Sequence, residues 1–179
     1  MKNKYKILTE IIELCLYLDV TACSTYRKFA LECKIPSLAA EWDLRAKEEK
    51  SHILFWKQAL ILSKEKQLPL IFENPVEVKN KLKKIKHTLK RIFSTFNAYS
   101  DPSEELTIAF LLENYMLDPF FMMMFHAYSF INENIEDEYE KHLLTFINMS
   151  KRYHTKSDSL HVELFNETLH NLYVINRKL

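Results

Sequence analysis

The chain has 179 residues, a formal net charge of +1 and no glycine. This length suits one domain spanning residues 1–179, and a hydrophobic fraction of 47% indicates a globular protein rather than a disordered one. Tight hairpin turns and phosphate-binding loops depend on glycine. The composition therefore excludes the glycine-rich dinucleotide motif and the P-loop, and it favours an all-α fold.

The cysteines and the most apolar segment bear on where the protein resides. Cys15, Cys23 and Cys33 are odd in number and lack the spacing of a zinc site, which is typical of reduced thiols in a cytoplasmic protein. We expect no signal peptide before them. Residues 106–131 are strongly apolar but contain Glu113, and a charge near the middle of a membrane span costs roughly 3 kcal/mol on insertion scales. We therefore expect a buried core helix and no membrane span.

The first half of the chain predicts two long helices. Residues 6–33 carry apolar side chains at three- and four-residue intervals, and Asp19 interrupts this apolar face. A second helix is predicted from the turn at Pro36 to residue 66. Glu49 and His52 lie within or beside its apolar stripe.

Residues 76–99 predict a basic amphipathic helix that connects two parts of the fold. Its basic run, residues 79–91, is typical of a solvated face, and we expect no binding to nucleic acid. A third core helix is predicted after Pro102; it carries Glu113, and Pro119 is expected to kink it.

The last third of the chain predicts a turn followed by one or two helices. Residues 132–137 are polar and indicate the turn, whereas residues 139–177 contain no proline. An unbroken helix over this segment would be roughly 60 Å long, so we expect a bend or break near Ser157.

Carboxylates and histidines occur at helical spacings that suit metal binding. Glu49 and His52 form an E-x-x-H pair, in which residues three apart project from one face of a helix. His154, Asp158 and His161 share one face of a later helix. Buried imidazole and carboxylate groups without partners each cost several kcal/mol, and coordination of a metal is one arrangement that offsets this cost.

Glu113 completes the predicted ligand set because it lies in the least polar part of the chain, where an ionised carboxylate needs a cation or strong hydrogen-bond donors. If the chain reverses near Ile135, Glu113 is level with Ser157. Six oxygen and nitrogen ligands without a thiolate suit two iron ions, with manganese as the alternative metal. The predicted metal ligands are Glu49, His52, Glu113, His154, Asp158 and His161.

These residues resemble the heme-oxygenase-like di-iron oxidases, whose helical bundle is shared with heme oxygenase and the thiaminase-like proteins. In that family one core helix carries a Glu and a downstream His, a second carries a Glu, and a third carries H-x3-D-x2/3-H. The resemblance covers residues 48–165. It implies an O2-activating non-heme di-iron oxidase or oxygenase, with Glu113 as the bridging carboxylate. A small carboxylate-bearing or lipophilic substrate and an unidentified electron donor are also implied, and a homodimer is left open.

A second resemblance is to ferritin-like and rubrerythrin-like four-helix bundles, here with extra helices. That arrangement would use Asp19, Glu49, His52 and Glu113 together with an E-x-x-H pair on the fourth helix. The residue pairs available there are Tyr139 with His142, Lys151 with His154, and Glu167 with His170. Since the first two pairs lack the Glu and the third falls on a polar face, the sequence favours the heme-oxygenase-like interpretation.

Three alternatives concern the role of the polar core. The protein is an oxidase, an iron-binding protein of the ferritin-like type, or a metal-free helical module that docks a partner through its basic helix. Tyr26, Tyr115 and Tyr153 flank the predicted site or face the same core, where they either pack or take part in its chemistry.

Overall fold

The computed structural model describes residues 2–95, 102–116 and 119–153. These residues form helices and short connections without any strand, so the all-α prediction is confirmed. The elements are α1 (Lys2–Glu32), α2 (Pro36–Lys64), α3 (Pro75–Thr95), α4 (Pro102–Met116), α5 (Pro119–Ala127), the 3-10 helix η1 (Ser129–Ile131) and α6 (Ile135–Tyr153).

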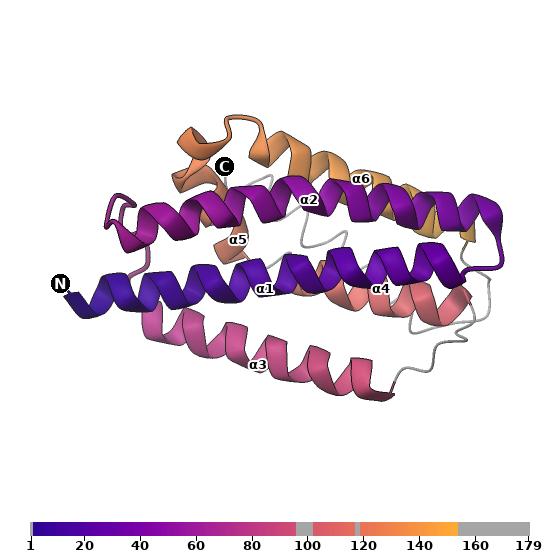
Figure 1. Ribbon diagram of the computed structural model, residues 1–179, viewed down its shortest axis with the longest axis horizontal. Helices are drawn as coiled ribbons and strands as arrows, with labels where there is room; N and C mark the ends of the chain where they lie inside the picture. The colour runs from indigo at the N-terminus through magenta and orange to yellow at the C-terminus, as the bar shows by residue number, and fades with distance from the viewer. Residues whose placement is uncertain (1, 96–101, 117–118, 154–179) are drawn as a thin grey trace.

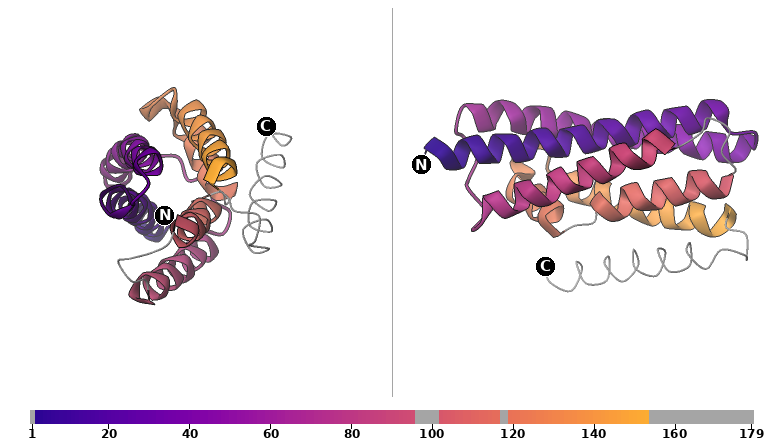
Figure 2. Two further views of the ribbon diagram at one scale, coloured as in Figure 1. Left: turned by 90° about the vertical axis from the view of Figure 1, so that its right-hand side faces the viewer. Right: turned by 90° about the horizontal axis from the view of Figure 1, so that it is seen from below.

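Four of the helices surround one interior. Helix α1 contacts α2 and α4, and α6 contacts the same two helices from the opposite side. Figure 1 shows α1 and α2 running lengthwise beside each other in opposite directions, and the end-on view in Figure 2 shows α1, α2, α4 and α6 as a bundle. Each of the four helices therefore has a face that points to a common core.

Helix α3 connects the two halves of this bundle. It follows α2 in the chain, packs against α1, and carries the polypeptide along the length of the molecule to the start of α4 (Figure 1). Its apolar face buries Leu82, Ile85 and Leu89. Because α3 spans the bundle, α2 and α4 run in the same direction, and bundles with one long crossover of this kind are an established arrangement of four helices.

The core is built largely from aromatic side chains. Trp42 and Trp56 on α2 are both completely buried, and each indole nitrogen donates a hydrogen bond to a carboxylate: Trp42 to Glu105 at 2.8 Å and Trp56 to Asp19 at 2.6 Å. A buried indole N–H needs an acceptor because an unpaired donor in the interior is costly. These two bonds join α2 to α4 and to α1, and they fix how the helices are rotated about their axes.

The apolar segment after Pro119 forms part of this core. Phe120, Phe121, Met124 and Phe125 are buried, which accords with plain core packing. No helix in the described part of the chain is both long and apolar enough to cross a membrane.

The structure corrects the predicted continuation from α4 into the next helix. One kinked helix was expected through Pro119, but α4 ends at Met116 and α5 starts a separate helix at Pro119. The short elements α5 and η1 then precede α6, which begins at Ile135 within the segment predicted as a turn. The alignment of Glu113 with Ser157 assumed an uninterrupted helix up to the reversal. With that helix broken, the residue opposite Glu113 is His142.

Two adjacent leucines on α6 test the packing that holds this helix in place. Leu143 is buried and Leu144 is 49% exposed. We expect Leu143→Ala to lower the free energy of unfolding by about 2–5 kcal/mol, because it leaves a cavity in the core. Leu144→Ala on the same helix should change it by about 0.5 kcal/mol or less. Urea denaturation of both variants measures the difference, and equal losses would contradict the described packing.

Candidate metal centre

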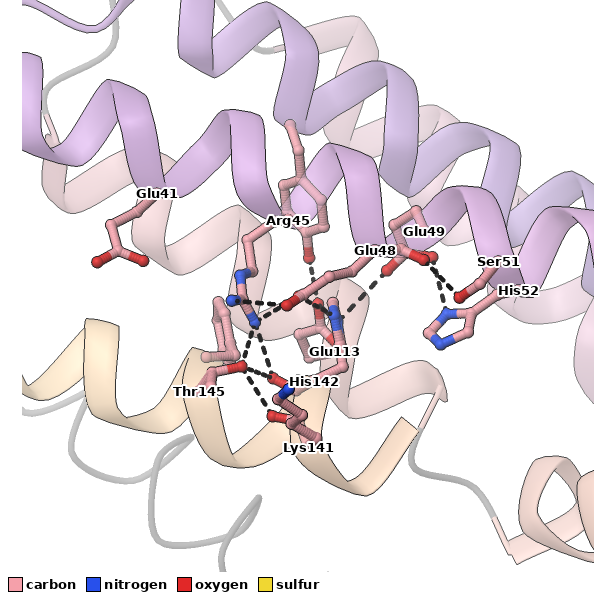
Figure 3. Close-up of polar contacts among 12 residues, drawn as sticks. Glu41, Arg45, Glu48, Glu49, Ser51, His52, Glu113, Lys141, His142 and Thr145 are labelled. Atoms are coloured by element: carbon pink, nitrogen blue, oxygen red, sulfur yellow. Dashed lines mark hydrogen bonds and ion pairs between the residues drawn. The ribbon is translucent and has the colours of Figure 1, made fainter. Parts of the chain in front are cut away.

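Five ionisable side chains from four helices meet inside the bundle. We call them the carboxylate–histidine cluster: Asp19 from α1, Glu49 and His52 from α2, Glu113 from α4, and His142 from α6. Each is at most 2% exposed. Figure 3 shows Glu49, Glu113 and His142 pointing toward one another from their three helices.

The cluster consists of two groups of three residues that share Glu49. Asp19, Glu49 and His52 form the first group, and Glu49, Glu113 and His142 form the second. Within each group, one potential ligand atom from every residue lies within 4.8 Å of the others. Since a carboxylate has two oxygen atoms, Glu49 is placed to bind in both groups at once, and its position suits a bridging ligand better than that of Glu113, the bridge expected from the sequence.

Neutral donors from neighbouring helices orient two of the carboxylates. The Tyr26 hydroxyl donates to Glu113 Oε1 at 2.5 Å, and the Trp56 indole donates to Asp19 Oδ2 at 2.6 Å. Both donors are completely buried. Each bond occupies one oxygen of its carboxylate and so limits the directions in which the other oxygen can point.

The two histidines lie in different surroundings. His142 Nε2 lies 2.9 Å from Glu113 Oε1 and 3.4 Å from Glu49 Oε1. His52 Nδ1 lies 3.3 Å from Glu49 Oε2, and its ring packs against the rings of Phe125 and Tyr139 with centroid distances of 6.0 and 5.4 Å. Each ring thus presents one nitrogen atom to the shared carboxylate.

Burial and mutual repulsion keep several of these groups neutral in the metal-free protein. Burial raises the pKa of Glu49 to about 8, and burial together with the nearby Glu49 raises the pKa of Asp19 well above its usual range. Burial also lowers the pKa of His52 to about 4. At neutral pH Glu49 therefore holds its proton and the imidazole of His52 is uncharged, while burial favours the protonated form of Asp19.

Glu113 and His142 form the closest ion pair between described members of the cluster, at 2.9 Å. Burial disfavours the charge on His142, but the adjacent Glu113 and the hydrogen bonds to Glu113 and Glu48 outweigh it and raise its pKa to about 10. Burial likewise acts to raise the pKa of Glu113, yet the charge of His142 and the bonds from His142 and Tyr26 hold it below its usual value. Each partner thus stabilises the charged form of the other.

Two buried oxygen atoms of the cluster make no hydrogen bond within the described part of the chain. They are Glu49 Oε1 and Glu113 Oε2, which come from the group that contains His142. Buried carboxylate oxygens normally have partners, and a missing partner in a native structure calls for an explanation. A bound cation would supply it, so these residues fit a metal ion by both donor type and unsatisfied capacity.

The structure brings together half of the ligands predicted from the sequence. Glu49, His52 and Glu113 all belong to the cluster. His154, Asp158 and His161 lie outside the described residues, and their role stays a prediction.

Two further members of the cluster were not among the six predicted ligands. Asp19 and His142 appeared only in the ferritin-like alternative, where the pair of Tyr139 with His142 was set aside because it lacks a carboxylate. Helical periodicity could have predicted that His142 is buried, because it lies on the same face of α6 as Tyr139 and Phe146. Tyr26, predicted to face the core, contacts the cluster through Glu113.

Comparisons with known protein families, with curated proteins and with solved structures give no match for this chain. What can be inferred about its function therefore rests on the geometry of the cluster.

The pKa shifts predict how the stability of the metal-free protein depends on pH. Glu49 and His142 both bind a proton more tightly in the folded state than in the unfolded state. Between the unfolded pKa of His142, 6.5, and the folded pKa of Glu49, about 8, both groups lose stabilisation as the pH rises. We expect the free energy of unfolding to fall by about 1–2 kcal/mol per pH unit in this interval. Urea denaturation in the presence of a chelator measures it.

A variant isolates the contribution of one group to this dependence. Glu49→Gln removes a titrating carboxyl while keeping its size, so the fall in stability with pH should become shallower. A stability that is constant or rises between pH 6.5 and pH 8 would contradict the protonation states described for the cluster.

Proposed function

We propose that this protein is an O2-dependent oxidoreductase that holds two iron or manganese ions in the carboxylate–histidine cluster. The observation that carries the proposal is the convergence of five acid and imidazole groups from four helices on one buried point, with Glu49 common to two sets of ligands. Oxygen and nitrogen donors without a thiolate suit these two metals.

The order of ligands along the bundle supports a dinuclear centre of the ferritin-like kind. In such bundles two helices each supply a carboxylate and the other two each supply an E-x-x-H pair. Here α1 and α4 supply Asp19 and Glu113, and α2 supplies Glu49 with His52. Helix α6 supplies His142, three residues after Tyr139, which stands where the pair would have its Glu. This resemblance, the weaker of the two drawn from the sequence, accounts for more of the described residues.

Tyr139 distinguishes the proposed centre from one with two E-x-x-H pairs. Tyr139 packs against His52 and stands where the second pair would have its carboxylate, so the cluster has three carboxylates and two imidazoles. Each group offers three protein ligands, which would leave a bound metal able to take further ligands, as catalytic metal sites require.

The residues of the chain contribute binding, orientation and exclusion of water. Glu49 joins the two groups, Tyr26 and Trp56 hold Glu113 and Asp19 by hydrogen bonds, and the rings of Phe125 and Tyr139 close the site beside His52. Bound iron would supply the redox chemistry that couples reduction of O2 to oxidation of a small organic substrate. Turnover would require an external electron donor.

Metal analysis tests the proposal. After anaerobic loading with Fe(II) and removal of excess metal, we expect about two ions per chain in the wild type. Glu49→Gln should lose both ions because Glu49 serves both groups, whereas Asp19→Asn should retain about one. Elemental analysis gives the metal content, circular dichroism verifies the helical fold, and an oxygen electrode measures O2 consumption by the loaded protein.

The control is a histidine remote from the cluster. His126 on α5 has a side chain that is 69% exposed and contacts Glu136, so His126→Ala should leave the metal content unchanged. A fully helical wild type that binds no metal would overturn the proposal and favour a metal-free module. Uptake of many irons per chain without oxidation of an organic substrate would favour iron storage.

A further pair of variants distinguishes the two candidate ligand sets. The heme-oxygenase-like interpretation requires Asp158 and assigns no role to Asp19, whereas the described cluster contains Asp19 and His142. If Asp158→Asn keeps both ions and Asp19→Asn does not, the ligand set is the described one. The reverse result would support the heme-oxygenase-like set.

A further inference from the structure

Glu48, the neighbour of Glu49 in the chain, contacts the cluster without belonging to either group of ligands. Its Oε2 accepts a hydrogen bond from His142 Nδ1 at 2.9 Å, on the side of the ring opposite to the nitrogen that faces Glu113. Figure 3 shows this carboxylate between Arg45 and His142. The Glu48 side chain is 25% exposed, so it lies at the boundary between the buried cluster and solvent.

Arg45 fixes the position of this carboxylate. Its guanidinium contacts both oxygen atoms of Glu48, with Nη1 2.7 Å from Oε2 and Nη2 3.1 Å from Oε1. The Arg45 side chain is completely buried. Contacts at both ends of the carboxylate restrict its rotation, which a single hydrogen bond does not.

The same guanidinium also holds the backbone of α6. Arg45 Nη1 donates to the carbonyl oxygen of His142 at 2.9 Å and to the hydroxyl of Thr145 at 2.6 Å. His142 is thus held at two points from α2: its carbonyl by Arg45 and its ring by Glu48. The ring cannot turn about its side-chain bonds without breaking the second contact.

A neutral imidazole carries its proton on one nitrogen atom and can bind a metal only with the other. An acceptor at Nδ1 keeps the proton there and leaves Nε2 as the free donor atom. In metal sites such a carboxylate behind a histidine ligand sets the ring orientation, and its loss typically costs 10–100-fold in affinity. Glu48 has this relation to His142, whose Nε2 faces Glu113 and Glu49.

We infer that Glu48, held by Arg45, is a positioning residue that directs His142 Nε2 toward the ion shared by Glu49, Glu113 and His142. This inference rests on the proposed dinuclear centre. It assigns Glu48 no contact with an ion or a substrate, and it predicts that the two ions respond differently to a change at this position.

Two substitutions of Glu48 distinguish the effect of its side-chain length from the effect of its charge. Glu48→Asp keeps the charge that pairs with Arg45 but shortens the side chain, so its carboxylate falls short of His142 Nδ1. Glu48→Gln keeps the length and an acceptor oxygen but loses the charge. If Glu48 positions His142 through the hydrogen bond, Glu48→Asp should lower the affinity for one of the two ions about 10–100-fold and leave the affinity for the other unchanged. The metal affinities of Glu48→Gln should be closer to those of the wild type.

The measurement is an equilibrium titration of the metal-free full chain with Co(II), followed by visible absorption. Co(II) reports the ligand geometry of each ion, so Glu48→Asp should alter the spectrum of the weakened ion only. Glu41 provides the matched control, because it lies two helical turns earlier on α2 and also joins α6, through Arg152 at 2.6 Å. Glu41→Asp should leave both affinities and both spectra unchanged.

Each remaining outcome overturns the inference. Retained affinity in Glu48→Asp with a loss in Glu48→Gln would show that charge rather than position matters. Equal losses in Glu48→Asp and Glu41→Asp would indicate a general weakening of the α2–α6 contact. If the wild type binds two Co(II) ions and both Glu48 variants have the same affinities and spectra, the positioning role alone is ruled out. A wild type that binds none removes the proposed centre as well.

Discussion

The interior of this bundle is organised around the cost of burying charge. Asp19, Glu49 and Glu113 are removed from water together, and three such carboxylates cannot all be ionised at close range without a compensating cation. In the metal-free protein, burial favours the protonated forms of Asp19 and Glu49, and the charge of His142 offsets that of Glu113. A pair of metal ions would replace these protons, so binding of metal and stability of the fold would be linked.

The topology determines which groups share this interior. Because α3 carries the chain along the bundle, each of α1, α2, α4 and α6 has antiparallel neighbours and presents one face to the centre. Trp42 and Trp56 then set the rotation of α2 through bonds to Glu105 and Asp19. The same bonds that satisfy the two indoles therefore aim Glu49 and His52 inward, so core packing and the carboxylate–histidine cluster are parts of one arrangement.

The sequence predicted the helical fold, the positions of the first three long helices, and Glu49, His52 and Glu113 as buried polar groups, because periodicity and turn residues are local signals. It did not indicate that His142 contacts Glu113, since the alignment across the bundle depends on the break after Met116 and on the short α5 and η1. The sequence did point to Asp19, because this residue interrupts an apolar stripe. The sequence did not point to Arg45 and Glu48, because their roles arise from contacts with α6 that residue spacing along one helix cannot predict.

Arg45, Glu48, Glu49 and His52 lie within about two turns of α2, and this concentration constrains how the chain can change. Insertion or deletion of one residue just before this segment would rotate all four side chains by about 100° relative to Trp42. Two residues of the cluster and the two groups that contact His142 would leave the interior in a single step. A change of length in the connection before α3 leaves this segment in place, whereas a shift of register within α2 displaces all four side chains together.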